Sequence, residues 1–152
     1  MLFRLILAGL MCALWLPQAM ACSCIPPLPA SEAFKSADAV FVGSVTSFGV
    51  RGEPEKSDFD GREVLAFRQG RQAVFRVKKA YKGVQEETIT VFTGEGGGDC
   101  GFDFIVGHEY LIYANTSDGQ LYAGICSRIK DVWFSNWQDA KEDFDFLESL
   151  NK

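Results

Sequence analysis

The sequence predicts a mainly β protein with flanking helices, and three observations support this prediction. Several short segments alternate apolar and polar residues, as half-buried strands do. Turn-forming residues separate these segments, and near its end the chain changes to a helical period. Short connections favour antiparallel pairing. Five such strands that close on themselves, with helices packed outside, fit a small Greek-key barrel of the OB type.

Five segments have the composition of strands. The first is almost entirely apolar, as a mostly buried strand is, whereas the second and third alternate and are expected to pair. In chain order the expected strands are residues 39–45, 74–81, 88–92, 110–114 and 121–125. Residues 51–62 are polar and rich in turn formers, so we expect an exposed loop there.

Two helices are expected outside the strands. Ser31 can cap a short helix that runs through Ser36, with Phe34 facing inward. Near the end of the chain, apolar residues recur at spacings of 4, 3 and 3, which predicts a C-terminal amphipathic helix. These apolar residues are Ala140, Phe144, Leu147 and Leu150. The acidic residues between them are interpreted as an exposed, solubilising face; they are Glu142, Asp143, Asp145 and Glu148.

Residues 1–21 have the three parts of a signal peptide: Arg4, an apolar run over residues 5–16, and small residues directly before Cys22. Export is therefore predicted, to the periplasm or to the outside of the cell. The apolar run, about 12 residues, is too short to cross a bilayer of roughly 30 Å. Because no later segment is long and apolar enough either, we expect no transmembrane segment.

Cleavage would leave residues 22–152, which are 131 residues of the 152 and suffice for one domain with a single core. Loss of Arg4 leaves 14 basic and 20 acidic residues, a formal charge of about −6. Such a charge gives no basic surface for phosphates, so we expect no nucleic-acid partner. We also expect a monomer.

Four cysteines remain after cleavage: Cys22, Cys24, Cys100 and Cys126. An even number in an exported protein predicts two disulfides, for which three pairings exist. A bond between Cys22 and Cys24 would close a strained ring, so each is expected to have a distant partner. Prolines after Cys24 favour a stiff, extended arm; they are Pro26, Pro27 and Pro29.

The position of Cys22 gives the Cys22-Ser23-Cys24 motif a possible chemistry. Cleavage before Cys22 would place an α-amino group and a carbonyl on one residue, and these two groups can close a five-membered chelate ring on a metal ion. A disulfide at the same residue would hold them rigid. The structural alternative is that the two cysteines only staple the N-terminus to the body of the protein.

Other candidate sites have simpler explanations. His108 is the only histidine, and one histidine supplies neither a conventional zinc site nor, without a nucleophile motif, a hydrolase. We interpret it as part of a solvated turn and expect no enzyme. Residues 94–98 are glycine-rich but lack the lysine of a phosphate loop, so they are interpreted as a connector. Aromatic residues near the strands and the last helix are interpreted as core rather than as a ligand-stacking surface; they are Phe102, Phe104, Trp133, Phe134 and Trp137.

The motif also carries a resemblance. Residues 22–27, Cys-Ser-Cys-Ile-Pro-Pro, closely resemble the start of the mature tissue inhibitors of metalloproteinases. Further matches follow in the same order, and they are residues 33–34, 37–41, 77–83, 100–101, 109–112 and Cys126. The resemblance covers the chain after the signal peptide, but only against the N-terminal, netrin-like domain of that family.

The resemblance implies an OB-type barrel in which Cys22 bonds to Cys100 and Cys24 bonds to Cys126. It also implies a secreted inhibitor whose partner is a zinc metalloendopeptidase. The backbone amine and carbonyl of Cys22 would bind the zinc of the protease, and the inhibitor itself would need no cofactor. Ser23 would enter the pocket beside the zinc. The remaining implied contacts lie along the cleft or in a second contact segment, and they are Cys24, Ile25, Pro26, Gly98 and Asp99.

The sequence departs from the family pattern at two points. The third disulfide of the family's N-terminal domain is missing, with Lys35 near the position of its first cysteine, and the family's C-terminal domain has no counterpart. The alternative function is therefore a non-inhibitory extracytoplasmic module on the same barrel, possibly a lipoprotein acylated at Cys22. Acylation would consume the sulfur of Cys22 and leave three thiols, an odd number that argues against it.

Overall fold

The computed structural model describes residues 22–26, 28–96 and 99–150. The predicted signal peptide, Pro27 and Gly98 lie outside the described residues. The described strands are β1 (Ala39–Phe59), β2 (Arg62–Lys82), β3 (Thr88–Thr93), β4 (Glu109–Ser117), β5 (Gln120–Tyr122) and β6 (Ile129–Asp131). The described helices are α2 (Ala30–Ser36), the 3-10 helix η2 (Phe134–Ala140) and α3 (Lys141–Ser149).

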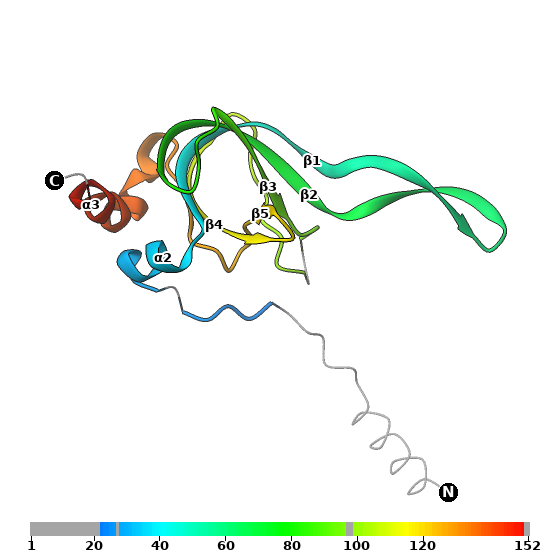
Figure 1. Cartoon of the computed structure of the whole chain (residues 1–152), viewed down its shortest axis with the longest axis horizontal. Helices are drawn as coiled ribbons and strands as arrows, with labels where there is room; N and C mark the ends of the chain where they lie inside the picture. Colours follow the sequence, from blue (N-terminus) through cyan, green and yellow to red (C-terminus); the bar gives the residue numbers. More distant parts are fainter. Residues whose placement is uncertain (1–21, 27, 97–98, 151–152) are drawn as a thin grey trace, which may run out of the picture.

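The strands form one sheet that closes on itself. Its order is β1-β2-β3-β5-β4-β6, and a further pairing of β1 with β4 closes the ring that Figure 1 shows. In that closing pair Ala39 lies opposite Ala114 and Ser44 opposite Glu109. The helices lie outside the ring (Figure 1). The predicted fold class, a mainly β closed sheet with flanking helices and two disulfides, is confirmed.

The sheet differs from the expected strand set at two points. Strands β3 and β5 pair in parallel, with Val91 opposite Leu121, whereas only antiparallel pairs were expected. Their parallel direction is possible because β4 lies between them in the chain, so no hairpin joins them. Strand β6 is a sixth strand beside β4. Its three residues are too few to show a period-two pattern.

The first part of β1, residues 39–45, is almost entirely apolar because both of its faces are covered. Phe41 points into the barrel, while Val40 and Val42 belong to a second buried cluster beneath the helices. The same alternation holds on β4, where Ile112 lies inside and Leu111 faces the helices. The hydrophobic core therefore has two layers, one within the barrel and one between the barrel and the helices.

Aromatic rings fill the barrel. Phe75 is fully buried and packs edge-on against Phe41, Phe104 and Tyr110, with ring centroids 5.5, 5.2 and 6.4 Å apart. The interpretation of the aromatic residues as core thus holds for Phe104. It is wrong for Trp133 and Trp137, which are 36% and 48% exposed.

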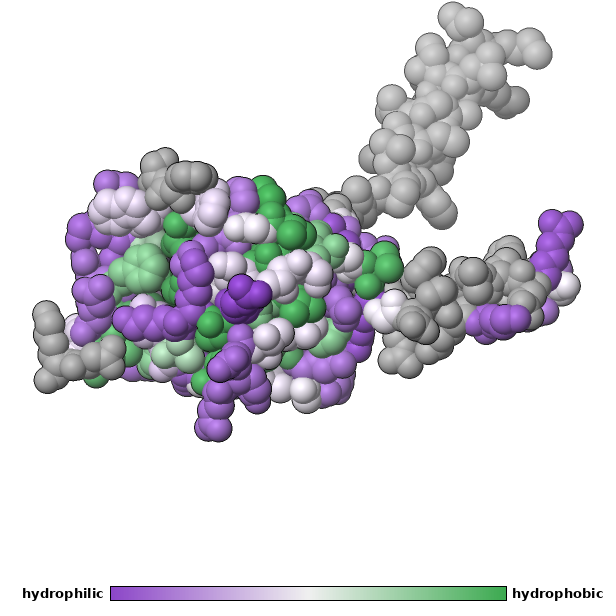
Figure 2. All heavy atoms as spheres, turned by 90° about the horizontal axis from the view of Figure 1, so that it is seen from above, coloured by the Kyte–Doolittle hydropathy of each residue, from purple (hydrophilic) through white to green (hydrophobic). Residues whose placement is uncertain are grey.

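Residues 51–62 do not form the expected loop. They belong to a long hairpin of β1 and β2 that projects from the barrel and carries hydrophilic residues at its far end (Figures 1 and 2). Asp60 and Gly61 have φ angles of 54° and 72°, as a two-residue type I′ turn requires. The side chain of Asp58 accepts a hydrogen bond from Gly61 N at 3.0 Å. Asp-Gly was therefore the turn signal, and the polar residues on either side of it belong to strands, with Lys56, Asp58 and Arg62 exposed.

The ends of helix α2 are stabilised from elsewhere in the chain. Its N-cap residue is Pro29, with no side-chain cap, so the cap expected from Ser31 is wrong. At its C-terminus Lys82 Nζ donates hydrogen bonds to the carbonyl groups of Phe34, at 2.9 Å, and Lys35, at 3.0 Å. A cation at this end is favourable because the last carbonyls of a helix have no partners within it.

Helix α3 packs beside α2 through an edge-on pair of Phe34 and Phe146, with ring centroids 5.6 Å apart (Figure 1). Its acidic residues are not all on the exposed face. Asp143 is fully buried, which contradicts the interpretation of this side chain as part of a solubilising surface. Its partner is described with the site below.

Candidate functional site

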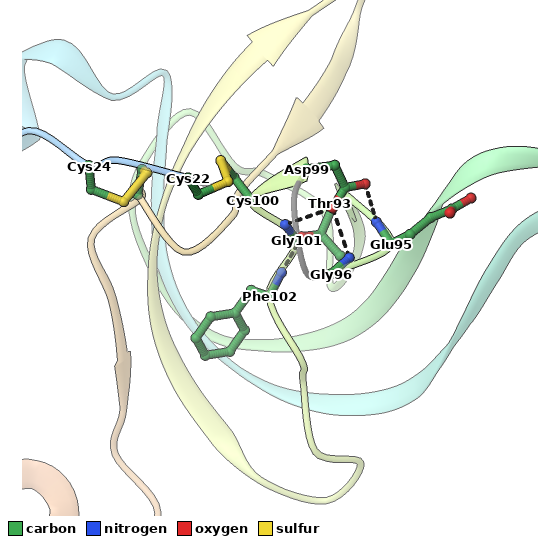
Figure 3. The surroundings of a disulfide bond; sticks show 10 residues. Cys22, Cys24, Thr93, Glu95, Gly96, Asp99, Cys100, Gly101 and Phe102 are labelled. Carbon is green, nitrogen blue, oxygen red and sulfur yellow. Dashed lines mark hydrogen bonds between the residues drawn. A yellow bond between two sulfur atoms is a disulfide. The ribbon is translucent and has the colours of Figure 1, made fainter. Parts of the chain in front are cut away.

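Two disulfides fix the N-terminal arm, described over residues 22–26 and 28–29, to the barrel. Cys22 bonds to Cys100, with Cα atoms 5.6 Å apart, and Cys24 bonds to Cys126, with Cα atoms 5.1 Å apart. This is the pairing that the family resemblance implies. The bonds span 78 and 102 residues of sequence, so they tie the start of the arm to two distant parts of the chain (Figure 3).

The two disulfides are neighbours because their barrel ends touch. Ile125 N donates a hydrogen bond to Cys100 O at 2.9 Å, directly before Cys126 in the chain. Gly124 makes this approach possible, since a Cβ atom at its position would lie 2.3 Å from Cys100 O. That distance is far below van der Waals contact, so only glycine fits at position 124 without a shift of the backbone.

We therefore predict that Gly124→Ala separates the two disulfide-bearing segments. The free energy of unfolding should fall by about 1–3 kcal/mol, the usual cost of forcing an extra methyl group into a packed site. Thermal and denaturant unfolding measure this change. Gly119→Ala is the control for loss of a glycine, because Gly119 has open space around it and only its positive φ resists the substitution. A stability loss no larger than that of Gly119→Ala would contradict the prediction.

The middle of the arm is exposed. Ser23, Cys24 and Pro26 are classed as exposed, and Ile25 is 86% exposed. A cleft of about 650 Å³ lies between the arm and the body of the protein. Across the cleft from the arm lie residues of α2, β4 and the segment around β6, among them Ser36, Tyr113, Asn115, Ile129 and Lys130. The arm is therefore held mainly at its ends and stands away from the barrel between them.

The glycine-rich connector is organised by one carboxylate. Asp99 accepts hydrogen bonds from the backbone N–H groups of Glu95, Gly96 and Gly101, at 2.5, 2.8 and 3.2 Å (Figure 3). The hydrogen bond from Glu95, together with those from Gly96 and Gly101, lowers the pKa of Asp99 more than desolvation raises it. The pKa of Asp99 is therefore below its ordinary value of 3.8. Cys100 follows directly, so this loop also fixes the partner of Cys22.

The pKa of Asp99 gives a prediction for Asp99→Asn. A carboxylate with a lowered pKa in the folded state stabilises the fold above its unfolded pKa, and that contribution disappears as the pH falls through its folded pKa. Asp99→Asn should therefore be less stable than the wild type at neutral pH, and the difference should shrink below pH 3.8. Urea unfolding at several pH values measures this. Asp139→Asn, an exposed carboxylate on η2 and outside this loop, is the control. A difference that does not change with pH would contradict the assignment.

Arg71 on β2 supports the same loop from the barrel side. Its Nε donates a hydrogen bond to Gly94 O at 3.0 Å, and its Nη1 forms an ion pair with Asp103. The guanidinium also lies over the ring of Phe48, 4.9 Å from its centroid. Arg71 and Asp99 thus hold residues 94–96, the described part of the connector, between strand β3 and the first disulfide.

The base of the arm carries a group of residues that the sequence reasoning missed. Arg128, two residues after Cys126, binds the buried Asp143 through Nε at 2.5 Å and Nη2 at 3.1 Å. Its Nη1 donates to Leu28 O at 2.6 Å, and Glu142 Oε2 lies 3.3 Å from Nη2. Hydrogen bonding from Ala30 N and the charge of Arg128 lower the pKa of Glu142. The sequence did contain one indication that Asp143 is buried. Asp143 follows Ala140 by three residues and therefore lies on the same apolar face of the helix.

His108 is half-buried rather than solvated. Its Nδ1 lies 2.9 Å from Asp131 Oδ2, and its ring stacks on Trp133 with centroids 5.8 Å apart. Within the described ranges, no three His, Cys, Asp or Glu side chains come together in a way that could hold a metal ion. No helix in the described part of the chain is long and apolar enough to cross a membrane.

The predicted contact residues gather at one place. Cys22, Ser23, Cys24 and the loop at Asp99 lie around the two neighbouring disulfides (Figure 3), and Gly98 is outside the described residues. A family model described as tissue inhibitor of metalloproteinase matches residues 20–142. No curated protein matches the chain.

Proposed function

The chain belongs to the tissue inhibitor of metalloproteinase family, and from that premise we propose that it is a secreted inhibitor of zinc metalloendopeptidases. Residues 22–152 would form a single domain after removal of the signal peptide. The family description supports a metalloproteinase as the partner in general. The specific mechanism proposed below rests on the arm, which is exposed along its middle and anchored by both disulfides.

Cys22 is the proposed zinc ligand. After cleavage its α-amino nitrogen and carbonyl oxygen would chelate the zinc of the target and displace the water that the zinc activates. The amine must be neutral to bind, and an α-amino group with an unperturbed pKa of roughly 7.7–8.0 supplies that form near neutral pH. The zinc belongs to the protease, so the inhibitor carries no cofactor of its own.

The neighbours of Cys22 are the proposed cleft contacts. Ser23 would enter the pocket beside the zinc, and Cys24, Ile25 and Pro26 would lie along the cleft. The exposure of these residues supports this role, since none of them is needed for the core. Gly98 and Asp99 are proposed as the second contact segment. Because the Asp99 carboxylate binds within its own loop, it is the outer surface of the loop that would meet the protease.

The test is titration of purified catalytic domains of several zinc metalloendopeptidases with the protein that begins at Cys22. We expect stoichiometric inhibition of at least one of them. Serine and cysteine proteases are the controls and should be unaffected, because they have no zinc to chelate. Full activity of every zinc enzyme at micromolar inhibitor would refute the proposal.

Intact mass spectrometry decides whether the arm has the required chemistry. The exported protein should begin at an unmodified Cys22 and should gain four hydrogens on reduction, as two disulfides require. The bond from Cys22 to Cys100 favours this result, because it uses the sulfur that acylation would need. A diacylglycerol group on Cys22 would instead support the non-inhibitory lipoprotein.

A further inference from the structure

The end of the arm is tied to distant residues on both sides of Pro29, namely Arg128 just before β6 and Glu142 on α3. Before Pro29, the carbonyl group of Leu28 accepts a hydrogen bond from Arg128 at 2.6 Å. After Pro29, Ala30 N donates to Glu142 Oε1 at 3.0 Å. Proline has no N–H group of its own. These two bonds therefore engage both polar backbone groups that flank Pro29, and both come from residues about a hundred positions later in the chain.

The direction of the Arg128 guanidinium is fixed by Asp143. Two of its nitrogens bind the two carboxylate oxygens of Asp143, which is fully buried, and the Arg128 side chain is only 11% exposed. A planar guanidinium bound through two nitrogens has no rotational freedom left. Its remaining nitrogen, Nη1, is therefore aimed at Leu28 O.

The arm between Cys24 and Leu28 therefore forms a short bridge, and both of its ends are held by the segment from Cys126 to Arg128. Cys24 is bonded to Cys126, and Leu28 is bonded to Arg128 only two residues further along the chain. Between these anchors Ile25 is 86% exposed, and the cleft separates the bridge from the barrel. Because packing beneath the bridge is sparse, its conformation depends on the two anchors.

We propose that Arg128, oriented by Asp143 and assisted by Glu142, is a positioning residue that holds the arm in its protease-binding conformation. This inference rests on the proposed inhibitory function. An arm that is ordered before binding loses less conformational entropy when it enters the cleft of a protease. Ordering of one further residue corresponds to about tenfold in affinity, so loss of the second anchor should weaken inhibition by about that factor.

Two variants test the inference. Arg128→Met/Asp143→Leu removes the anchor on Leu28 while replacing a buried ion pair by apolar side chains, an exchange that usually preserves folding. Glu142→Ala removes the bond to Ala30 at a side chain that is 65% exposed, so the fold itself should be unaffected. Glu148→Ala, on the exposed face of the same helix, is the matched control.

The readouts are the backbone ¹⁵N order parameters of Ile25 and Leu28, the hydrogen exchange of Ala30 N–H, and the inhibition constant. We expect lower order parameters and about tenfold weaker inhibition in the double variant. We expect faster exchange at Ala30 in Glu142→Ala and no change in Glu148→Ala. The midpoint of thermal unfolding should stay close to that of the wild type, which a purely structural role would not allow.

Unchanged order parameters and exchange rates in both test variants would overturn the inference. Lower order with an unchanged inhibition constant would also overturn it, since the arm would then be flexible without consequence. Order and exchange are measured on the inhibitor alone. If the wild type inhibits no zinc protease, the proposed function fails, and these measurements still decide whether Arg128 orders the arm.

Discussion

One alanine added before Cys22 is expected to weaken inhibition by at least about a thousandfold, or roughly 4 kcal/mol of binding free energy. The added residue converts the α-amino group of Cys22 into an amide, whose nitrogen does not donate an electron pair to zinc at neutral pH. The new amine lies about 3.8 Å further along the chain, so it no longer forms a five-membered ring with the carbonyl of Cys22. The measurement is titration of a sensitive metalloendopeptidase with the extended and the mature protein.

Two controls accompany this variant. Its thermal unfolding and its two disulfides should match those of the mature protein, because Cys22 and Cys24 keep their partners on the barrel. Removal of the added alanine by an aminopeptidase should restore inhibition. If the extended protein inhibits as well as the mature one, chelation by Cys22 is wrong even though inhibition is real.

The fold class was predictable because hydrophobic burial leaves local patterns. The apolar run over residues 39–45 predicted a strand covered on both faces, and β1 lies between the barrel interior and the helices. The alternation in residues 74–81 predicted the last part of β2 in the same way. Period and apolar content are properties of a few neighbouring residues, so a single sequence displays them.

The long hairpin was not predicted, because residues 51–62 are almost all polar and show no apolar–polar alternation. Asp60-Gly61 was visible as a type I′ turn signal, but the charged residues on either side were interpreted as loop. The strands extend to this turn through backbone pairing, for example Asp58 with Glu63. Backbone hydrogen bonds between strands require few particular residue types, so the sequence gives little indication of them.

The candidate site, like the fold, was predicted only in part. The arm and its cysteines were predicted because the Cys22-Ser23-Cys24 motif is a local sequence pattern and because it resembles the family. The contacts at the base of the arm were not predicted, because Arg128 and Asp143 form an ion pair only in the folded protein and no local pattern links them. The buried position of Asp143 could be inferred from its place on the apolar face of α3, but its partner could not.

Asp143→Ala is expected to lower the free energy of unfolding by about 3–5 kcal/mol, the usual cost of removing one member of a buried ion pair. The substitution leaves the guanidinium of Arg128 in the interior, with an exposed carboxylate of Glu142 as its remaining ionic neighbour. It also leaves a cavity beside Tyr113, whose pKa is raised by burial and by the nearby Asp143. Denaturant unfolding at neutral pH measures the loss.

Asp145→Ala is the matched control, since Asp145 lies two residues later on the same helix in an exposed pair with Lys141. Exposed pairs of this kind contribute about 0.5 kcal/mol or less. The double variant Arg128→Met/Asp143→Leu should recover most of the stability that Asp143→Ala loses, because no charge then remains buried. A double variant as unstable as Asp143→Ala would show that packing, rather than the unpaired charge of Arg128, causes the loss. Recovery of stability without recovery of arm order would separate the two roles of Arg128: its charge balances Asp143 in the core, and its third nitrogen fixes Leu28.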